Sequence, residues 1–383
     1  MRVASLAMVL AGCGRLGFDG SNDVVDGALD SALDPGIVEL AHRGSSPCVR
    51  TGEGRLVCWG SNTYGQLGRG SIEPRGGPQA VPLENVVRIA TGEFTSFAID
   101  RDGALWGWGN NLTGQLGLGT SSIEPSPVRI PIPEPVVAVA GGQYHTCAIT
   151  EGAGELYCWG GNECGALGTA DTAPRMTPTK VSGLAGLTSI AIHDHETCVN
   201  DATGTVRCFG GVSIGTCLGQ HLAPTPPVGL PAIRDVQGGC HLSMCATDIA
   251  GAGWCWGENI SGNLGDGSAT RHVDPLPVAS ISNVQLIGTG FDVSCAVGPS
   301  SMSCWGDNTH GQLGLGTSAI TQAVTPIRLP FFDQMSIDQI EVGCATVCVR
   351  IRDGIYCWGK NDSGVIDDTT IDAFAPRRVQ LPL

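Results

Sequence analysis

Three groups of residues carry side chains that could do chemistry, and none of them completes a catalytic site. The segment Gly211–Gly215 matches the Gly-x-Ser-x-Gly string of a hydrolase nucleophile, here Ser213, but that motif needs a following helix, which the sequence does not predict. His193-Asp194-His195 offers metal-binding groups, and we interpret it instead as the start of a strand. Asp367-Asp368 and Asp372 lack the glycine-centred spacing of a calcium loop. We therefore expect no catalytic residue, no metal and no cofactor.

Cysteine spacing gives a clearer chemical signal. Twelve of the 17 cysteines form six pairs whose members are 9–11 residues apart. If each pair spans the two strands of one hairpin, the Cβ atoms face each other within reach of a disulfide. In the remaining repeat, Phe97 and Gly107 occupy the two matching positions, so both cysteines are missing there together. The predicted disulfides are Cys48–Cys58, Cys147–Cys158, Cys198–Cys208, Cys245–Cys255, Cys295–Cys304 and Cys348–Cys357.

Four further cysteines leave their pairing open. Cys164 and Cys217 lie in equivalent loops and could pair with each other, whereas no pairing is predicted for Cys240 or Cys344. Cys344 and Cys348 have a spacing that zinc sites use, but Cys348 already fits the hairpin series. Many disulfides require an oxidising, extracytoplasmic compartment.

The elements that must position these residues come from an internal repeat. An aromatic residue followed by glycine recurs at intervals of 47–53 residues, and short strands such as Val136–Ala140, Thr146–Ile149 and Leu156–Trp159 accompany it. A proline-containing strand such as Pro127–Ile130 completes each unit. Four short strands in each of seven units predict an all-β, seven-bladed β-propeller that fills residues 37–383 as one domain. The seven markers are Trp59, Trp108, Trp159, Phe209, Trp256, Trp305 and Trp358.

The loop after each aromatic residue resembles a known repeat. Gly60–Gly68 reads GSNTYGQLG, and Asn111–Gly117 and Asn308–Gly314 follow the same N-x-x-G-Q-L-G pattern. This is similar to the regulator of chromosome condensation 1 repeat family, and the resemblance implies seven blades, with each tryptophan wedged between neighbouring blades. The fourth unit departs from the pattern by having Phe209 and no asparagine, and the seventh lacks the Leu-Gly pair.

The two positions before the loop glycine differ between units, although the framework around them recurs. Variable loops on one rim of a rigid propeller suit partner recognition, because binding residues concentrate on loops; neutral drift at exposed turns is the alternative. The candidate binding rim is Thr63, Tyr64, Leu112, Thr113, Glu163, Ile260, Ser261, Thr309, His310, Asp362 and Ser363.

The first residues resemble a bacterial lipoprotein signal. An apolar stretch leads into Leu10-Ala11-Gly12-Cys13, which is similar to a lipobox, so we expect residues 1–13 to be the signal and Cys13 to carry the lipid. The stretch is shorter than the usual 15–30 residues, which a start upstream of Met1 would explain. Residues 14–36 are acidic and predict a flexible linker. The alternative is a short apolar segment that joins the fold.

Composition narrows the function classes. The net charge of −15 argues against a nucleic-acid partner, and a hydrophobic content of 42% argues against a disordered chain. No run of 18 apolar residues is present, so we expect contact with a membrane only through the lipid.

We expect a monomeric, lipid-anchored binding propeller on a bacterial outer membrane or cell surface. It would recognise a protein or glycan through its loops, with inhibition of a secreted enzyme as a subtype. A propeller lyase or hydrolase is the alternative. Guanine-nucleotide exchange follows from the family name alone, and the absence of a basic tail and the oxidising compartment disfavour it.

Overall fold

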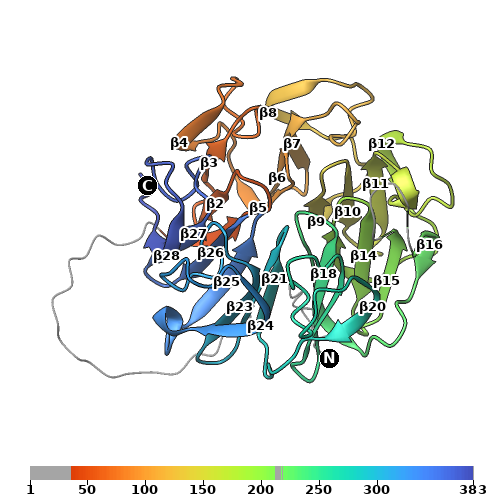
Figure 1. The fold of residues 1–383 in the computed structure, drawn as a ribbon. Coiled ribbons are helices and arrows are strands. Elements are labelled where there is room, and N and C mark those ends of the chain that lie inside the picture. The colour runs from red at the N-terminus through yellow and green to blue at the C-terminus, as the bar shows by residue number, and fades with distance from the viewer. Residues whose placement is uncertain (1–35, 212–216, 218, 383) are drawn as a thin grey trace, which may run out of the picture.

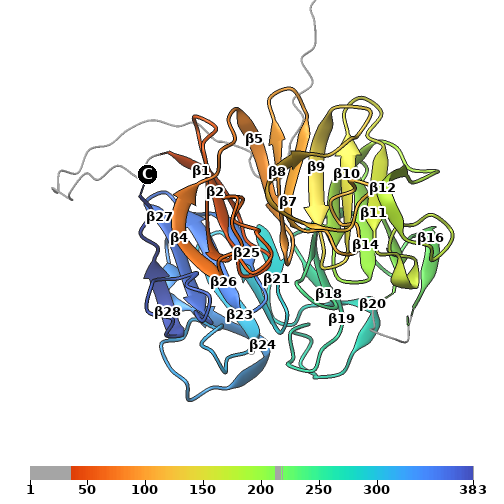
Figure 2. The ribbon, with the colours of Figure 1, turned by 90° about the horizontal axis from the view of Figure 1, so that it is seen from above.

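The computed structural model describes residues 36–211, 217 and 219–382. In these residues, 28 strands form seven antiparallel sheets, and each sheet consists of four consecutive strands. The sheets surround a central axis as blades (Figure 1), and Figure 2 shows the ring turned by 90°. The chain is therefore a seven-bladed β-propeller, as the sequence predicted.

The strands, in chain order, have the following bounds. Blades 1 and 2 contain β1 (Ile37–Ala41), β2 (Cys48–Thr51), β3 (Leu56–Ser61), β4 (Arg75–Ala80), β5 (Val86–Thr91), β6 (Thr95–Asp100), β7 (Leu105–Asn110) and β8 (Ile123–Arg129). Blades 3 and 4 contain β9 (Val136–Gly141), β10 (His145–Thr150), β11 (Leu156–Gly160), β12 (Arg175–Lys180), β13 (Leu187–Ile192), β14 (Glu196–Asp201), β15 (Val206–Gly210) and β16 (His221–Thr225). Blades 5 to 7 contain β17 (Ile233–Gly238), β18 (Ser243–Asp248), β19 (Gly253–Gly257), β20 (His272–Pro277), β21 (Leu286–Thr289), β22 (Val293–Val297), β23 (Met302–Asp307), β24 (Gln322–Leu329), β25 (Ile337–Val342), β26 (Thr346–Ile351), β27 (Gly354–Gly359) and β28 (Ala373–Arg378). Two short 3₁₀ turns, η1 (Glu163–Gly165) and η2 (Pro330–Phe332), lie in connections.

Connections at one end of the ring form a single surface, which we call the loop face. Because neighbouring strands are antiparallel, the loops after the first and third strands of every blade emerge at this end, and the opposite end is the turn face. The inner loops, after the first strands, are residues 42–47, 92–94, 142–144, 193–195, 239–242, 290–292 and 343–345. The outer loops, after the third strands, are residues 62–74, 111–122, 161–174, 258–271, 308–321, 360–372 and the described part of 211–220.

The tryptophan of each aromatic-glycine marker fills the space between two blades. All six are at most 1% exposed. The Nε1 of Trp108 donates to the carbonyl oxygen of Gln66 in the preceding blade at 2.9 Å, and Trp159 reaches Gln115 in the same way at 2.7 Å. Trp256 follows the divergent fourth blade and donates instead to the carboxylate of Glu196, at 3.3 Å. The wedge predicted from the resemblance is confirmed, and the indole N–H of each ring has a partner in the blade before it.

The glycine of the marker is required by a close approach of two backbones. Each of these glycines has a φ between +99° and +108°, which side-chain-bearing residues rarely adopt. A Cβ on Gly109 would also lie 2.4 Å from the carbonyl oxygen of Phe94 in the inner loop. Glycine at this point therefore lets the third strand bend where its pairing with the fourth strand shifts register.

The ring closes through side chains and not through a shared strand. The first and last blades each contain four consecutive strands and lie side by side, in red-orange and blue in Figures 1 and 2. Trp59 donates to the carbonyl oxygen of Val365 at 2.8 Å, and the side chain of Gln339 bonds both backbone groups of Leu40. The same wedge that joins internal blades thus joins the two ends of the ring.

Disulfides join each of the six hairpin pairs expected from the sequence. Their members lie directly opposite each other, on the second and third strands, with Cα atoms 4.0–4.2 Å apart. In blade 2 the same two positions hold Phe97 opposite Gly107. The remaining four cysteines also pair: Cys164–Cys217 joins the outer loops of blades 3 and 4, and Cys240–Cys344 joins the inner loops of blades 5 and 7.

Two parts of the sequence interpretation fall outside the described residues. Cys13, with the rest of the signal and nearly all of the linker, precedes residue 36, and Ser213 lies in the segment 212–216. In the part of the chain that is described, no helix is long and apolar enough to cross a membrane.

Candidate partner-binding face

The structure places all eleven candidate rim residues in the outer loops of the loop face. The framework residues around them hold the backbone: Leu67 N donates to Asn62 Oδ1 at 3.0 Å, and Tyr64 N donates to Gln66 Oε1 at 2.9 Å. The same pair of bonds recurs around Thr113 and His310. Asn62 is 2% exposed, so it acts as a buried brace. The buried asparagine and glutamine fix the loop, and the two variable side chains project from it.

Several rim side chains are free of side-chain partners and several are tied to neighbours. Ile260 and Leu112 are 78% and 52% exposed, which makes them the most accessible apolar groups of the rim. His310 Nδ1 lies 2.7 Å from a carboxylate oxygen of Asp372, and Thr113 Oγ1 donates to the carbonyl oxygen of Tyr144 at 3.1 Å. The rim therefore offers both apolar and polar contacts to a partner.

An inner ring of aromatic side chains was not predicted from the sequence. Phe94 contacts the rim residue Tyr64, with ring centroids 5.0 Å apart, and Tyr144 stacks on His195 at 5.4 Å. His241 stacks on Phe291 at 4.2 Å. The recurrence of an aromatic residue immediately before the second strand, in Phe94 and Tyr144, was the available signal.

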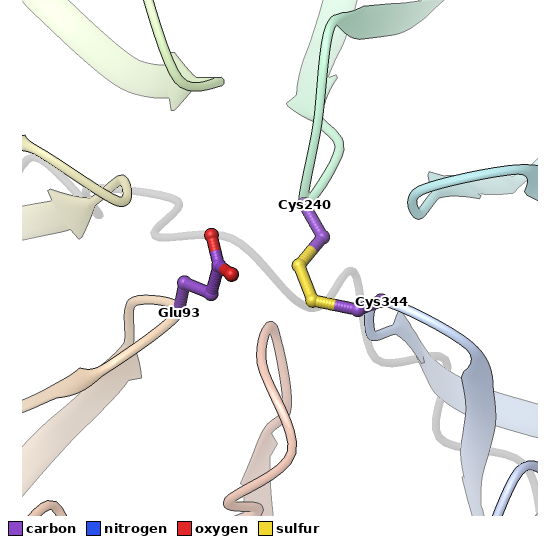
Figure 3. Close-up of side chains that lie close together, drawn as sticks. All are labelled: Glu93, Cys240 and Cys344. Atoms are coloured by element: carbon purple, nitrogen blue, oxygen red, sulfur yellow. A yellow bond between two sulfur atoms is a disulfide. The ribbon is translucent and has the colours of Figure 1, made fainter. Parts of the chain in front are cut away.

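At the axis, the inner loops converge and cover the centre of the loop face. Arg43 reaches across from blade 1, and its guanidinium donates to the carbonyl oxygens of Ile192, Gly238 and Gly239 in blades 4 and 5. The Cys240–Cys344 disulfide crosses beside it, and Figure 3 shows the Glu93 carboxylate turned toward this bond from a third loop. One arginine and one disulfide thus connect blades that are not neighbours.

Neither cysteine-containing cluster provides a metal site. Potential ligand atoms of Glu93, Cys240 and Cys344 lie within 4.8 Å of one another, and a second group combines Glu196 with a hairpin pair. All four sulfurs are engaged in disulfides, so none is a thiolate ligand. Cys344 and Cys348, whose spacing resembles that of zinc ligands, are likewise both in disulfides and offer no thiolate.

Two carboxyl groups at the axis, those of Glu93 and Asp194, have pKa values raised by burial. Burial raises the pKa of Glu93 to about 7, and the nearby Asp194 carboxylate adds to the shift while Arg43 opposes it. Burial likewise raises the pKa of Asp194 to about 6, against the opposing charges of His193 and Arg43. Desolvation lowers the pKa of Arg43 itself to about 10. His193-Asp194-His195 precedes β14 and is not the strand start we expected, so Asp194 lies in the inner loop.

A channel continues along the axis behind this closure. Its volume is about 280 Å³, and the first strands of the blades line it. Burial raises the pKa of Glu341 in this channel to about 8, and the charge of Glu39 adds to the shift. Glu39 itself pairs with Arg50 at 2.7 Å. The channel wall is therefore partly polar: Glu39 is paired with Arg50, and the raised pKa of Glu341 keeps it largely protonated near neutral pH.

Comparison with known proteins accounts for this architecture. The family model for the regulator of chromosome condensation (RCC1) repeat matches residues 53–99, 102–149, 153–199 and 304–349, and a second RCC1 repeat model matches residues 86–115 and 136–166. The chain belongs to the RCC1 repeat family. Residues 200–303, which include most of the fourth blade and all of the fifth, and residues 350–383 lie outside these matches, and the divergent loops of the fourth and seventh repeats fall in these stretches.

Individual relatives differ widely in what surrounds the propeller. The chain is 28% identical over 356 residues to the ultraviolet-B receptor UVR8 of Arabidopsis thaliana, covering 86% of this chain and 78% of UVR8. It is also 28% identical to the E3 ubiquitin-protein ligase HERC2 of Homo sapiens, but it spans only 7% of that protein's length.

Solved structures show the same fold. Yeast RCC1 (Prp20), in a crystal structure with Kap60, has a TM-score of 0.75 at 19% identity, covering 94% of this chain and 92% of the other. A structure of human WBSCR16 has a TM-score of 0.73 at 20% identity, covering 86% and 94%. Prp20p from Saccharomyces cerevisiae has also been crystallised in connection with its binding to Gsp1p and histones.

Proposed function

We propose that this chain is an extracytoplasmic, membrane-anchored binding protein that recognises a partner protein through its loop face. The observation that carries the proposal is the exposure of large apolar and aromatic side chains on loops that a buried framework holds rigidly. Ile260, Leu112, Phe291 and Tyr144 are 78%, 52%, 42% and 37% exposed. Aromatic side chains are enriched among the residues that dominate protein–protein binding energy, and burial of exposed apolar side chains adds to it.

The relatives support binding as the general role of this propeller. Prp20 binds Kap60, Gsp1p and histones, and UVR8 is a receptor. A propeller lyase or hydrolase remains the alternative, and no observation in the described residues favours it. A loop face that blocks the active site of a secreted enzyme is a subtype of the proposed function.

The cysteines support the proposed compartment. All 16 cysteines after Cys13 are disulfide-bonded in the structure, which fits an oxidising environment. We propose that Cys13 carries a lipid and that residues 14–36 form the tether. Replacing Cys13→Ser should move the protein from the membrane fraction to the soluble fraction on cell fractionation, because the lipid is the only anchor proposed. Unchanged membrane association would contradict lipidation.

Loop-face binding is tested by crosslinked capture from intact cells with two matched variants. Ile260→Asp places a charge on the loop face, and Ile249→Asp places the same charge on the turn face at a residue that is 72% exposed. We expect the first variant to lose the captured partner and the second to retain it. Equal capture by both variants would refute recognition through the loop face, and capture of a glycan alone would replace the protein partner by a carbohydrate.

A further inference from the structure

A small notch opens on the loop face where loops of blades 2, 3 and 4 meet. Its volume is about 50 Å³, and it is lined by Thr113, Tyr144, Glu163, Ala166 and Asp194, together with Gly161 and His195. One buried water needs roughly 10–15 Å³, so the notch can hold a compact polar group. Two of these residues, Thr113 and Glu163, belong to the rim selected from the sequence for its variability.

The floor of the notch carries a buried carboxylate with an unused oxygen. Asp194 is 3% exposed, and its Oδ1 has no hydrogen-bond partner among the described residues. Arg43, whose charge acts on Asp194, donates its guanidinium hydrogen bonds to three carbonyl oxygens. A buried carboxylate oxygen without a donor is costly, and a cation entering the notch would supply the missing donor.

The mouth of the notch adds a second acid and an aromatic wall. Glu163 is exposed on η1, and the adjacent Cys164 is bonded to Cys217, which holds this turn in place. Tyr144 stacks on His195 with ring centroids 5.4 Å apart and an interplanar angle of 16°, and both residues line the notch. Aromatic faces attract cations, and apolar walls accommodate the methylene stem of a lysine.

We propose that this notch receives a lysine side chain of the partner, with its ammonium group between Asp194 and Glu163 and its stem along Tyr144. The inference rests on the proposed function and specifies one contact of it. Lysine is favoured over arginine because its ammonium group is a compact point charge that suits a notch of about 50 Å³, whereas a guanidinium is a larger planar group. The carboxylates of Asp194 on the floor and Glu163 at the mouth also give the three N–H donors of the ammonium group two charged acceptors.

The experiment uses n-butylammonium as a lysine side-chain probe, with 1-butanol as a neutral probe of similar shape. Saturation-transfer NMR titrations with the full chain measure the Kd of each probe. We expect butylammonium to bind and butanol not to bind. Glu163→Gln and Asp194→Asn should each raise the butylammonium Kd by about tenfold, because each removes one charged acceptor.

Matched variants separate loss of the site from loss of the fold. Glu151→Gln removes an exposed acid from the turn face of the same blade and should leave the Kd unchanged. If Asp194→Asn lowers the melting temperature, Glu163→Gln and Tyr144→Leu test the exposed half of the notch. Equal binding to all variants, equal binding of butanol, or no binding of butylammonium would overturn the proposal. If the notch fails but partner capture still depends on Ile260, the lysine contact is wrong and the loop-face function stands.

Discussion

At the scale of single residues, buried titratable groups near the axis contribute to the pH dependence of stability. Glu341 has a folded pKa of about 8, well above the ordinary value of 4.5. Between these values the folded state holds a proton that the unfolded state has released, so the free energy of unfolding falls as pH rises. Glu93 and Asp194 act in the same direction, with folded pKa values of about 7 and 6.

Buried histidines act in the opposite direction at lower pH. Burial lowers the pKa of His42 to about 4 and that of His145 to about 3, below the ordinary value of 6.5. Between the folded and ordinary values the unfolded state binds more protons, so stability rises with pH over that interval. The carboxyl groups and the histidines therefore oppose each other between about pH 4.5 and pH 6, where raised carboxyl pKa values lower stability with rising pH and lowered histidine pKa values raise it.

The Glu341→Gln substitution tests the carboxyl part of this explanation. The amide keeps an oxygen to accept the hydrogen bond that Gln339 donates at 2.9 Å, and it carries no charge at any pH. We expect the melting temperature to rise by about 1–3 °C at pH 9 and to change little at pH 5. Glu84→Gln, at an exposed position, is the control and should show no pH-dependent gain. An equal gain at both pH values would show that Glu341 is not protonated in the folded state near neutral pH.

At the scale of the blade, the hairpin disulfide is one of two ways to fill the same space. In blade 2, Phe97 lies opposite Gly107, and a Cβ on Gly107 would lie 3.2 Å from the Phe97 ring and 2.8 Å from Ile130. Phe97 is 1% exposed, so its ring occupies the volume that two sulfurs occupy in the other blades. The large side chain of Phe97 therefore fills the space that the missing side chain of Gly107 leaves.

The double substitution Phe97→Cys/Gly107→Cys should create a seventh hairpin disulfide. The two positions are directly opposed on β6 and β7, as the native pairs are on their strands. Peptide mapping without reduction should find the new bond beside the six native ones. Relative to Phe97→Ser/Gly107→Ser, the oxidised variant should be more stable by about 2.5 kcal/mol in the chain-entropy account. Free thiols at positions 97 and 107 would contradict the equivalence of the seven hairpins.

Blade-level structure was predictable because it is local and repeated. The alternation in Val136–Ala140 and the cysteine spacing within each hairpin follow from contacts between residues close in sequence. The inner loops were not predictable, because their roles arise only when the ring closes. Arg43 bonds carbonyl groups about half of the chain away, and Cys240 pairs with a cysteine 104 residues later. Asp194 becomes buried, with its Oδ1 lacking a hydrogen-bond partner among the described residues, only in that assembled centre.

At the scale of the whole molecule, the ring presents two ends with different construction. Loops of variable sequence cover the loop face, and Arg43 and the Cys240–Cys344 disulfide close its centre. Hairpin turns and interblade connections form the turn face. Because the wedged tryptophans fix each blade against its neighbour, the loop face is held as a rigid surface, which lowers the ordering cost of binding a partner.

The most direct test of recognition through this surface is site-specific photocrosslinking in intact cells. A photoreactive phenylalanine derivative replaces Ile260 on the loop face or Ile249 on the turn face, which are similarly exposed at 78% and 72%. The crosslinked products are then identified by mass spectrometry. Binding through the loop face predicts one discrete partner adduct from position 260 and none from position 249. An adduct from position 249 with none from position 260 would contradict it.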